Sequence, residues 1–386
     1  VPGDVGSQTS TAVDTVKCGS CVRVTAECVE CWVRVWGIEL VLEAIVSAED
    51  DAELRRLGIT NRSLRTRQME FTSYLELAMA PHGADKAHPA FAKMFIETEY
   101  PEECVLIAHR RPRSPEEDPI WTGHLLIGAT DGVQFETDRS KFLGRGNTPE
   151  TAVALRSGLS GTVGTVIDPV FSLRCRVALD PRERKELTFV TVAAATREAL
   201  LDLIHKYARG GSIARAFEMA WTRAQLEFRF LRIGPGAAHR FQELASQLLY
   251  PSSRLRPPVE RLAKNRLGQP GLWAYGISGD LPMLVVTVSD SRHLALVREV
   301  LLAHAYWRLR GFKTDLIILN QEGPSYDQPL RQDLLRQIEA HTSDAGMDKP
   351  GGVFLRDWHS LPDDARNLLI PPAGAVPDGN RAPLPP

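Results

Sequence analysis

Two aromatic side chains and a carboxylate lie close together between residues 272 and 282. They are Trp273, Tyr275 and Asp280. Flat aromatic rings can stack on the C–H face of a sugar, and a carboxylate accepts hydrogen bonds from sugar hydroxyls. The three residues therefore predict a carbohydrate-binding surface, with packing at a domain interface as the alternative. The glycines of this segment do not predict a phosphate loop, because the segment precedes a strand, whereas phosphate loops follow one.

A second candidate is the arginine of a Gly-Arg-Gly turn. Arg145 is flanked by Gly144 and Gly146, whose backbone freedom can direct the guanidinium outward. Such a guanidinium can bind a sugar, a carboxylate or a phosphate, or form a structural ion pair. The sequence leaves these alternatives open. Asp138 and Arg139, just upstream, would face opposite sides of a continuous strand, which argues against an acid–base pair.

The cysteine spacing near the N-terminus could hold a metal ion. Cys18 and Cys21 form one Cys-x-x-Cys pair, and Cys28 and Cys31 form another, so four thiolates could bind one tetrahedral zinc. The gap between the pairs is shorter than the roughly 12 to 20 residues of common zinc ribbons. We therefore favour an atypical N-terminus without metal. No histidine stands at a metal-ligand spacing, and no Ser/His/Asp set is evident, so the sequence predicts no metal, no cofactor and no catalytic residue.

Composition excludes several classes of protein. The chain has 386 residues, 46 Lys and Arg against 48 Asp and Glu, and a formal net charge of -2. A nucleic-acid-binding protein would need a basic surplus to neutralise phosphates. No window reaches about 18 apolar residues without a charge, so a membrane span is not expected. The N-terminal residues lack the charged and apolar regions of a secretory signal, and without an initiator Met the sequence is interpreted as a fragment.

Apolar periodicity predicts an α+β protein. The first half alternates apolar and polar residues with a period of two, most clearly over 171–179, which is typical of antiparallel strands. Many short strands without intervening helices predict a large antiparallel β-supersandwich over 35–195. Helical patterns then predict a linker over 196–265. Alternating strands and helices predict a small α/β layer with a parallel sheet over 266–370.

The two ends differ in composition from the rest of the chain. Residues 1–34 are rich in Ser, Thr and Cys and show no sustained hydrophobic period, so we expect an irregular, disordered segment there. Residues 371–386 contain six prolines and two glycines, which predicts a disordered tail.

Several motifs occur together in one order along the chain. They are 57–63, 72–74, 88–91, 110–114, 136–139, 142–146, 159–161, 168–174 and 272–282. In combination they resemble the sandwich-and-linker region of cyclic β-1,2-glucan synthases, which is related to inverting glycoside phosphorylases such as cellobiose phosphorylase. The resemblance covers about 35–370 and implies a carbohydrate-binding β-supersandwich followed by helices and an α/β segment.

The resemblance also implies what this chain lacks. In these phosphorylases an aspartic acid on an (α/α) barrel protonates the glycosidic oxygen while phosphate attacks the opposite face. No position here matches that motif, so the chain is expected to be inactive alone. Implied partners are β-glucan or another oligosaccharide and the barrel and membrane modules of a parent glycosyltransferase or phosphorylase. The implied location is the cytoplasmic side of the bacterial inner membrane. A homodimer is a further possible assembly.

Three functions remain for comparison with the structure. The first is a carbohydrate-binding, non-catalytic part of a cyclic β-1,2-glucan synthase. The second is a purely structural sandwich that supports a barrel or a dimer and binds no sugar. The third is a zinc-dependent interaction protein, which depends on the four N-terminal cysteines.

Overall fold

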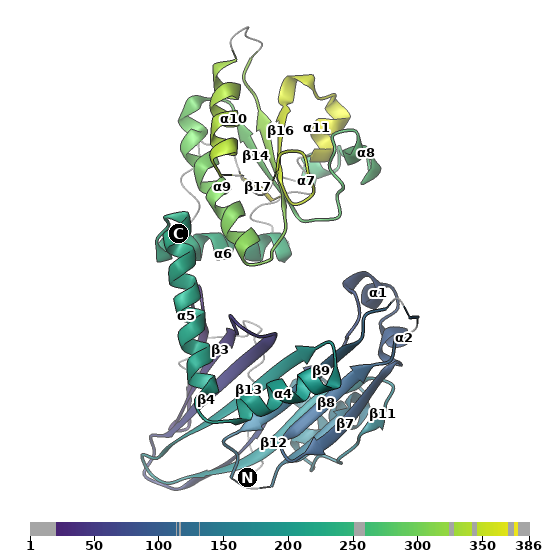
Figure 1. Ribbon diagram of the computed structural model, residues 1–386, viewed down its shortest axis with the longest axis vertical. Coiled ribbons are helices and arrows are strands. Elements are labelled where there is room, and N and C mark those ends of the chain that lie inside the picture. Colours follow the sequence, from purple (N-terminus) through teal and green to yellow (C-terminus); the bar gives the residue numbers. More distant parts are fainter. Residues whose placement is uncertain are drawn as a thin grey trace. The chain divides into compact units, whose positions relative to one another are not determined.

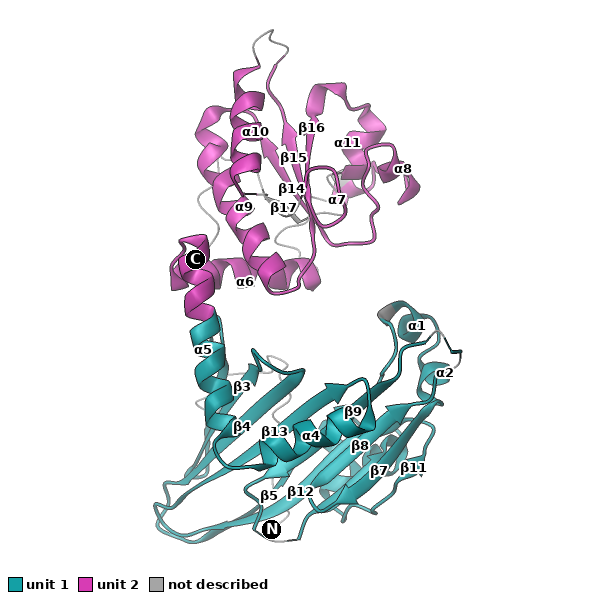
Figure 2. Ribbon diagram, in the orientation of Figure 1, with its two compact units in different colours: residues 1–223 teal, residues 224–386 magenta. Residues whose placement is uncertain are grey.

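The chain forms two compact units, residues 1–223 and 224–386 (Figure 2). The computed structural model describes residues 21–112, 114–115, 117–130, 132–250, 259–323, 328–341, 346–369 and 374–376. Each unit contains its own β-sheet structure and its own hydrophobic core. The division falls within the segment predicted as a helical linker.

The larger sheet of unit 1 contains nine antiparallel strands among the described residues (Figure 1). In chain order they are β1 (Cys21–Val24), β2 (Val29–Val35), β3 (Ile38–Val46), β4 (Ala52–Asn61), β7 (Ile96–Glu102), β8 (Val105–Arg110), β9 (Ile120–Ile127), β11 (Gly164–Thr165) and β13 (Arg184–Ala194). Their order across the sheet is β1-β2-β3-β4-β13-β9-β8-β7-β11. The late strand β13 therefore lies at the centre, between β4 and β9.

A smaller antiparallel sheet packs against the larger one. Its strands are β5 (Arg67–Thr72), β6 (Leu75–Glu76), β10 (Gln134–Asp138) and β12 (Pro169–Leu179), with β12 pairing with the other three. The inner side of β12 carries the alternating residues seen in the sequence, and all of them are buried: Phe171, Leu173, Cys175, Val177 and Leu179. They meet apolar residues of β3, β4, β8 and β13 from the larger sheet. The predicted α+β supersandwich is confirmed.

The outer face of the larger sheet is covered by helices α4 (Arg197–Ala208) and α5 (Ser212–Leu231), the latter continuing into unit 2. Thr196 is the N-cap of α4, and its Oγ1 accepts a hydrogen bond from the backbone N of Ala199 at 3.2 Å. A glycine permits the close approach of this helix, because a Cβ on Gly123 would lie 2.9 Å from Cδ1 of Ile204. The core of this face includes Leu200 and Ile204.

Short helices interrupt the strands of unit 1, contrary to the expectation of an unbroken run of strands. They are α1 (His82–Ala87), α2 (Pro89–Lys93), α3 (Arg139–Leu143) and the 3-10 helices η1 (Pro149–Thr151) and η2 (Val153–Leu155). Each is too brief to produce a sustained helical period in the sequence. Helix α2 begins with proline at its first position, where the missing N–H costs nothing.

The N-terminal expectation is wrong for residues 21–34. Strands β1 and β2 form a hairpin, and β2 pairs with β3 along its whole length. The turn is closed by Thr25, whose Oγ1 accepts from the backbone N of Cys28 at 3.1 Å. The Ser, Thr and Cys content of the segment predicted irregular structure, but its β-branched valines favour a strand. Residues 1–20, including Cys18, lie outside the described ranges.

Unit 2 contains a parallel sheet of β14 (Met283–Val288), β15 (Asp315–Asn320), β16 (Val353–Asp357) and β17 (Gly374–Val376), ordered β16-β15-β14-β17. Helices lie on both faces of this sheet (Figure 1). The helices within unit 2 are α6 (Pro235–Leu249), α7 (Val259–Leu262), α8 (Pro270–Trp273), α9 (Leu294–Leu309), α10 (Pro329–His341) and α11 (Asp363–Leu369), with the 3-10 helices η3 (Ser291–His293) and η4 (Trp358–Ser360). The parallel direction follows the sequence-based prediction.

Strand β17 corrects the expectation that the whole segment 371–386 is irregular. Residues 374–376 pair with β14 in parallel register. Gly374, Ala375 and Val376 lie between Pro372 and Pro377, so no proline falls within the strand and each of its residues keeps a backbone N–H for the ladder. Within the described ranges, no helix combines the length and the apolar character that crossing a membrane requires.

Candidate functional site

Trp273 lies at the end of α8 with most of its ring in solvent. The side chain is 62% exposed, yet its indole Nε1 donates a hydrogen bond to the carbonyl oxygen of Ser278 at 3.2 Å. The chain turns back toward the ring through Gly276 and Gly279, whose φ angles are +72° and +76°. Only glycine adopts such angles without strain. The exposed ring is thus held in place by its own polar edge.

Asp280 belongs to the same turn. Its Oδ1 accepts a hydrogen bond from Nε2 of Gln269 at 2.8 Å, and the same amide donates to the carbonyl oxygen of Ser278 at 2.9 Å. The other carboxylate oxygen of Asp280 has no partner among the described residues, and the residue is exposed. The turn therefore presents a fixed flat ring together with a free acceptor, which matches two of the three residues predicted in this segment.

Tyr275 has a different environment. The residue is half-buried and packs against the core of unit 2, and its carbonyl oxygen accepts from Nη2 of Arg356 at 2.6 Å. Tyr275 therefore packs within its own unit and is the least accessible of the three predicted residues. Trp273 and Asp280 remain the exposed members of the predicted surface, which we call the Trp273 turn (residues 269–280).

Arg145 belongs to unit 1, whereas the Trp273 turn belongs to unit 2. The flanking Gly144 and Gly146 both have positive φ, at +77° and +75°. A Cβ on Gly144 would lie 2.5 Å from Cγ2 of Val153, so this glycine is needed both for its backbone angle and for space. Arg145 is exposed at the tip of the turn. The outward orientation predicted for its guanidinium is consistent with this placement.

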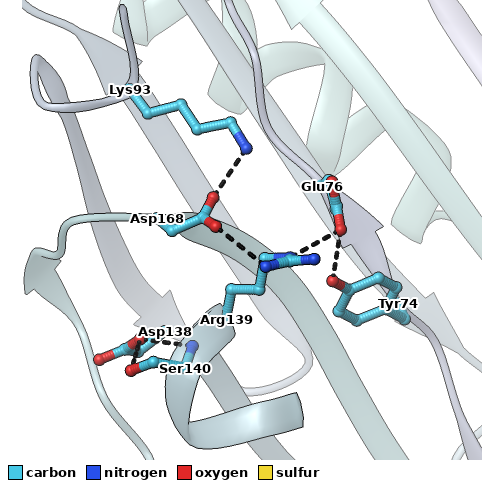
Figure 3. Close-up of polar contacts among 7 residues, drawn as sticks. All are labelled: Tyr74, Glu76, Lys93, Asp138, Arg139, Ser140 and Asp168. Atoms are coloured by element: carbon cyan, nitrogen blue, oxygen red, sulfur yellow. Dashed lines mark hydrogen bonds and ion pairs between the residues drawn. The ribbon is translucent and has the colours of Figure 1, made fainter. Parts of the chain in front are cut away.

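Arg139 joins several elements of unit 1 through a network of charged groups (Figure 3). Its Nε donates to Oε1 of Glu76 at 2.8 Å, and its Nη1 donates to Oδ2 of Asp168 at 3.3 Å. Lys93 Nζ lies 2.7 Å from the other oxygen of Asp168, and Tyr74 donates to Glu76 Oε1 at 2.7 Å. The network connects β6, α2 and α3 with the segment that precedes β12.

The strand does not continue past Asp138, so the sequence argument from a continuous strand does not apply. Asp138 ends β10 and caps α3, accepting from the backbone N of Ser140 at 2.8 Å and from its Oγ at 2.7 Å (Figure 3). Arg139 is the first residue of α3 and turns toward Glu76 and Asp168. The two residues have separate structural roles.

Contacts within the network shift the pKa values of Glu76, Arg139 and Tyr74 away from neutral pH. Burial alone would raise the pKa of Glu76, but hydrogen bonds from Tyr74 and Arg139 hold it below its ordinary value. The hydrogen bond to Glu76 raises the pKa of Arg139. Burial, followed by the hydrogen bond to Glu76, raises the pKa of Tyr74. None of these groups is poised to exchange a proton near pH 7, so the network can bind and orient but is unsuited to acid–base work.

The N-terminal cysteines give no metal site within the described part of the chain. Cys18 lies outside it, and the described residues contain no group of three or more His, Cys, Asp or Glu that could hold a metal. Cys21, Cys28 and Cys31 are free thiols. Burial, together with Glu43 and Glu30, raises the pKa of Cys28 to about 11, and burial also raises the pKa of Cys31. The raised pKa values of Cys28 and Cys31 disfavour the thiolate form in which a cysteine binds a metal.

The comparisons with known proteins define the class of this chain. A model of the family "Glycosyl hydrolase 94, supersandwich domain" matches residues 3–210, more than half of the sequence, and the chain belongs to this family. The match includes the β1–β2 hairpin.

Two curated relatives agree with that class. The cyclic beta-(1,2)-glucan synthase NdvB of Rhizobium meliloti (strain 1021) is 37% identical over 299 residues, which cover 76% of this chain and 11% of the relative. Solabiose phosphorylase of Paenibacillus borealis is 25% identical over 185 residues, covering 47% of this chain and 23% of the relative. This chain therefore spans about a tenth and about a quarter of their lengths. The predicted resemblance to cyclic β-1,2-glucan synthases and glycoside phosphorylases is confirmed.

Similarity to one solved structure is too low to support a conclusion about fold or function. The GH36 alpha-galactosidase AgaA of Geobacillus stearothermophilus is 8% identical, with a TM-score of 0.24 over 76% of this chain and 33% of that one.

Sequence reasoning missed most members of the Arg139 network. Tyr74, Arg139 and Asp168 fall inside the motifs that carry the family resemblance, but nothing in the sequence pairs them. Glu76 and Lys93 lie outside those motifs. Strand pairing brings the network together, since β6 and β10 both pair with β12.

Proposed function

We propose that this chain is a non-catalytic part of an enzyme of β-glucan metabolism and that it contacts the glucan through the Trp273 turn. The observation that carries the proposal is the indole of Trp273, 62% exposed but fixed by its hydrogen bond to Ser278. A fixed ring loses little entropy when a sugar stacks on it, and Asp280 supplies an acceptor for hydroxyls. The kinship with a glucan synthase supports glucan as the ligand.

The proposal extends to the whole enzyme. We place the chain beside a catalytic (α/α) barrel and membrane modules of a parent glucan synthase, on the cytoplasmic side of the bacterial inner membrane. The family membership and the small share of the relative that this chain spans support that arrangement. If the parent enzyme is a homodimer, we expect two copies of this chain to be present in it.

Isothermal titration of the chain with linear and cyclic β-1,2-glucans tests the sugar contact. We expect saturable binding that Trp273→Ala weakens about tenfold, equivalent to about 1.4 kcal/mol, and that Trp273→Phe weakens less because a ring remains. Trp221→Ala is the matched control, since Trp221 is also exposed, at 56%, but lies on α5 of unit 1. No heat up to about 10 mM glucan in the unmodified chain, a range in which an affinity of about 1 mM would be evident, would contradict the proposal.

A purely structural role is the second candidate. The ion-pair network that joins β6, α2 and α3 and the packing of Tyr275 against the core favour it. A chain that binds no glucan but whose addition stabilises a separately expressed barrel would support this alternative.

The non-catalytic part of the proposal has its own test. Incubated with β-1,2-glucan and inorganic phosphate, the chain is expected to release no glucose 1-phosphate. This is expected because no position of the sequence matches the catalytic aspartic acid of the related phosphorylases, and because the pKa of Glu76 is lowered and that of Arg139 is raised, which suits neither group to acid–base work near pH 7. Release of glucose 1-phosphate above a heat-inactivated control, retained after further purification, would show that catalytic groups are present.

A further inference from the structure

A pocket of about 300 Å³ lies on the outer face of the smaller sheet of unit 1. Its lining comes from β10, from α3, and from η2 with the loop that follows it, which together form the segment 154–160. We propose that this pocket, which we call the Glu136 pocket, binds one neutral sugar ring and is a second carbohydrate site, separate from the Trp273 turn. The proposal takes from the proposed function only that the ligand is a sugar.

The carboxylate of Glu136 fixes one side of the pocket. The residue is 1% exposed, and its Oε1 accepts from the backbone N of Thr137 and of Asp138, each at 3.0 Å. Its Oε2 accepts from the backbone N of Ser160 at 3.2 Å and also from the Ser160 hydroxyl. These four hydrogen bonds use the acceptor capacity of the carboxylate. Glu136 is therefore a positioning residue that holds the loop, not a ligand-binding group.

Arg174 fixes the other side of the same loop. Its side chain is buried, and its Nη2 and Nη1 donate to the carbonyl oxygens of Ala154 at 2.6 Å and Ser157 at 2.9 Å. Its Nε donates to Oγ1 of Thr72 on β5 at 2.8 Å. Because the loop is anchored by Glu136 and Arg174, the pocket exists before any ligand arrives, which reduces the entropic cost of binding.

The groups that face the pocket can both donate and accept. Lys141 uses one hydrogen bond to Oγ1 of Thr162, at 2.9 Å, and an ammonium has three hydrogens to donate. The hydroxyl groups of Ser157 and Ser160 donate to the Val153 carbonyl oxygen and to the Glu136 carboxylate, and each hydroxyl oxygen retains acceptor capacity. Sugar hydroxyls require donors and acceptors together, and this set supplies both.

The remaining lining is small or apolar. Ala154 and Leu159 provide C–H surface, and Gly158 has no side chain. Ser172 is the cross-strand partner of Glu136, so it lies on the same face of the sheet, and its buried hydroxyl has no hydrogen-bond partner among the described residues. This mixture of apolar wall and a few polar groups is typical of small-ligand sites.

The charges favour a neutral ligand over an anion. The pocket contains one carboxylate, Glu136, and one ammonium, Lys141. An anionic ligand would gain from Lys141 but would face the buried negative charge of Glu136 at close range. A neutral sugar meets no such opposition, so the chemistry of the lining identifies a neutral polyhydroxyl ring as the ligand.

A glycine substitution can fill the pocket with little steric disturbance to the fold. The atom nearest to a Cβ on Gly158 would be Oε1 of Gln134 at 3.6 Å, an ordinary contact, and Gly158 does not have positive φ. Gly158→Leu therefore adds a large side chain to a residue that lines the pocket. Gly210→Leu is the matched control in the same unit, because a Cβ there would meet nothing within 4 Å. Lys141→Gln removes the ammonium while leaving the backbone unchanged.

The experiment measures binding of sophorose, the β-1,2-linked glucose disaccharide, by calorimetry and by saturation-transfer NMR in the Trp273→Ala background. We expect residual millimolar binding that Gly158→Leu weakens at least tenfold, that Lys141→Gln weakens several-fold, and that Gly210→Leu leaves unchanged. Unfolding midpoints within the experimental error of the parent protein show that each variant is folded. Inorganic phosphate is titrated in parallel and is expected not to compete.

The outcomes separate this inference from the proposed function. Loss of all sophorose binding in Trp273→Ala, with Gly158→Leu and Lys141→Gln binding like the unmodified chain, would overturn the Glu136 pocket and leave the Trp273 turn intact. Loss in Gly158→Leu with no effect of Trp273→Ala would support the pocket and overturn the turn. Phosphate that displaces sophorose in a Lys141-dependent manner would contradict the neutral-ligand assignment.

Discussion

Acidification from pH 7 to pH 5 is expected to destabilise unit 1 by about 2 kcal/mol through one histidine. His124 is 4% exposed, on the inner side of β9. Its Nδ1 lies 3.0 Å from Oγ1 of Thr191, and its Nε2 lies 2.9 Å from Oγ of Ser73, on the segment that follows β5. The ring stacks with Phe171 and Phe189. It thus connects the two sheets as a neutral group.

The direction of the effect follows from the pKa values of the two states. Burial, with a smaller contribution from Arg55, lowers the pKa of His124 from 6.5 to about 3. As pH falls below 6.5, His124 binds a proton in the unfolded chain but not in the folded chain, so the free energy of unfolding decreases. The stabilisation is complete above pH 6.5 and is lost progressively down to about pH 3. The full difference corresponds to roughly 5 kcal/mol.

Between pH 7 and pH 5, we expect the change in the free energy of unfolding of unit 1 to report mainly on His124. Carboxylates with lowered pKa values, such as Asp50 and Glu76, lose their stabilisation only at lower pH. His304 also has a lowered pKa through burial, but it lies in unit 2. All six cysteines lie in unit 1, so thiol labelling during denaturant unfolding reports on unit 1 alone.

Two variants and one direct measurement check the prediction. His124→Gln is expected to lower stability at pH 7 but to flatten the dependence between pH 7 and pH 5. His205→Gln is the control, because His205 is a solvent-exposed histidine at the surface of α4. The ring carbon resonances of His124 should not titrate above about pH 4, given its pKa of about 3. A His124→Gln variant with an unchanged pH slope, or resonances that titrate near pH 6.5, would contradict the prediction.

The sandwich and the parallel sheet could be predicted because their residues alternate or cluster locally. In β12 every second residue from Phe171 to Leu179 is apolar, and all five are buried between the sheets. The helical segment predicted from residue 196 begins with α4, whose side-chain cap at Thr196 is a local signal. In the α/β segment predicted over 266–370, the mostly apolar residues Met283–Val288 form β14, which is buried on both faces.

Strand β17 could not be predicted, because its formation depends on a distant partner. It is three residues long, lies in a proline-rich segment and forms by pairing with β14. Strand β1 has a different reason: it is a four-residue hairpin arm with every residue exposed, so it has no buried face to produce an alternating pattern of apolar and polar residues.

Among the candidate sites, too, those formed by residues close in sequence could be predicted, and those formed by distant residues could not. Trp273, Ser278 and Asp280 are close in sequence, so their proximity in space followed from a single turn. Arg139 meets Glu76 from 63 positions away and Asp168 from 29 positions away. The Glu136 pocket depends on a loop anchored by contacts across β10 and β12. Such contacts depend on sheet register, which the hydrophobic pattern of a single strand does not determine.

Replacing Arg174 by methionine is expected to cost about 2 to 4 kcal/mol of stability. The guanidinium satisfies the carbonyl oxygens of Ala154 and Ser157 and the hydroxyl of Thr72. Without it two carbonyl groups of the loop lose their donors, each at a cost of about 1 to 3 kcal/mol where water cannot reach. Part of this cost is offset, because burial lowers the pKa of Arg174, which shows that its charge is itself poorly solvated.

Arg176 on the same strand provides a matched control. Its side chain is 72% exposed and pairs with Glu70 at 2.9 Å, so Arg176→Met should change stability by less than about 0.5 kcal/mol. Denaturant unfolding compares the two variants, and hydrogen exchange should rise over 154–160 in Arg174→Met alone. Equal stability of the two variants would mean that the loop does not depend on Arg174. Reduced stability with unchanged exchange would mean that Arg174 stabilises the sheet but not the pocket, so the Glu136 pocket would owe its shape to Glu136 alone.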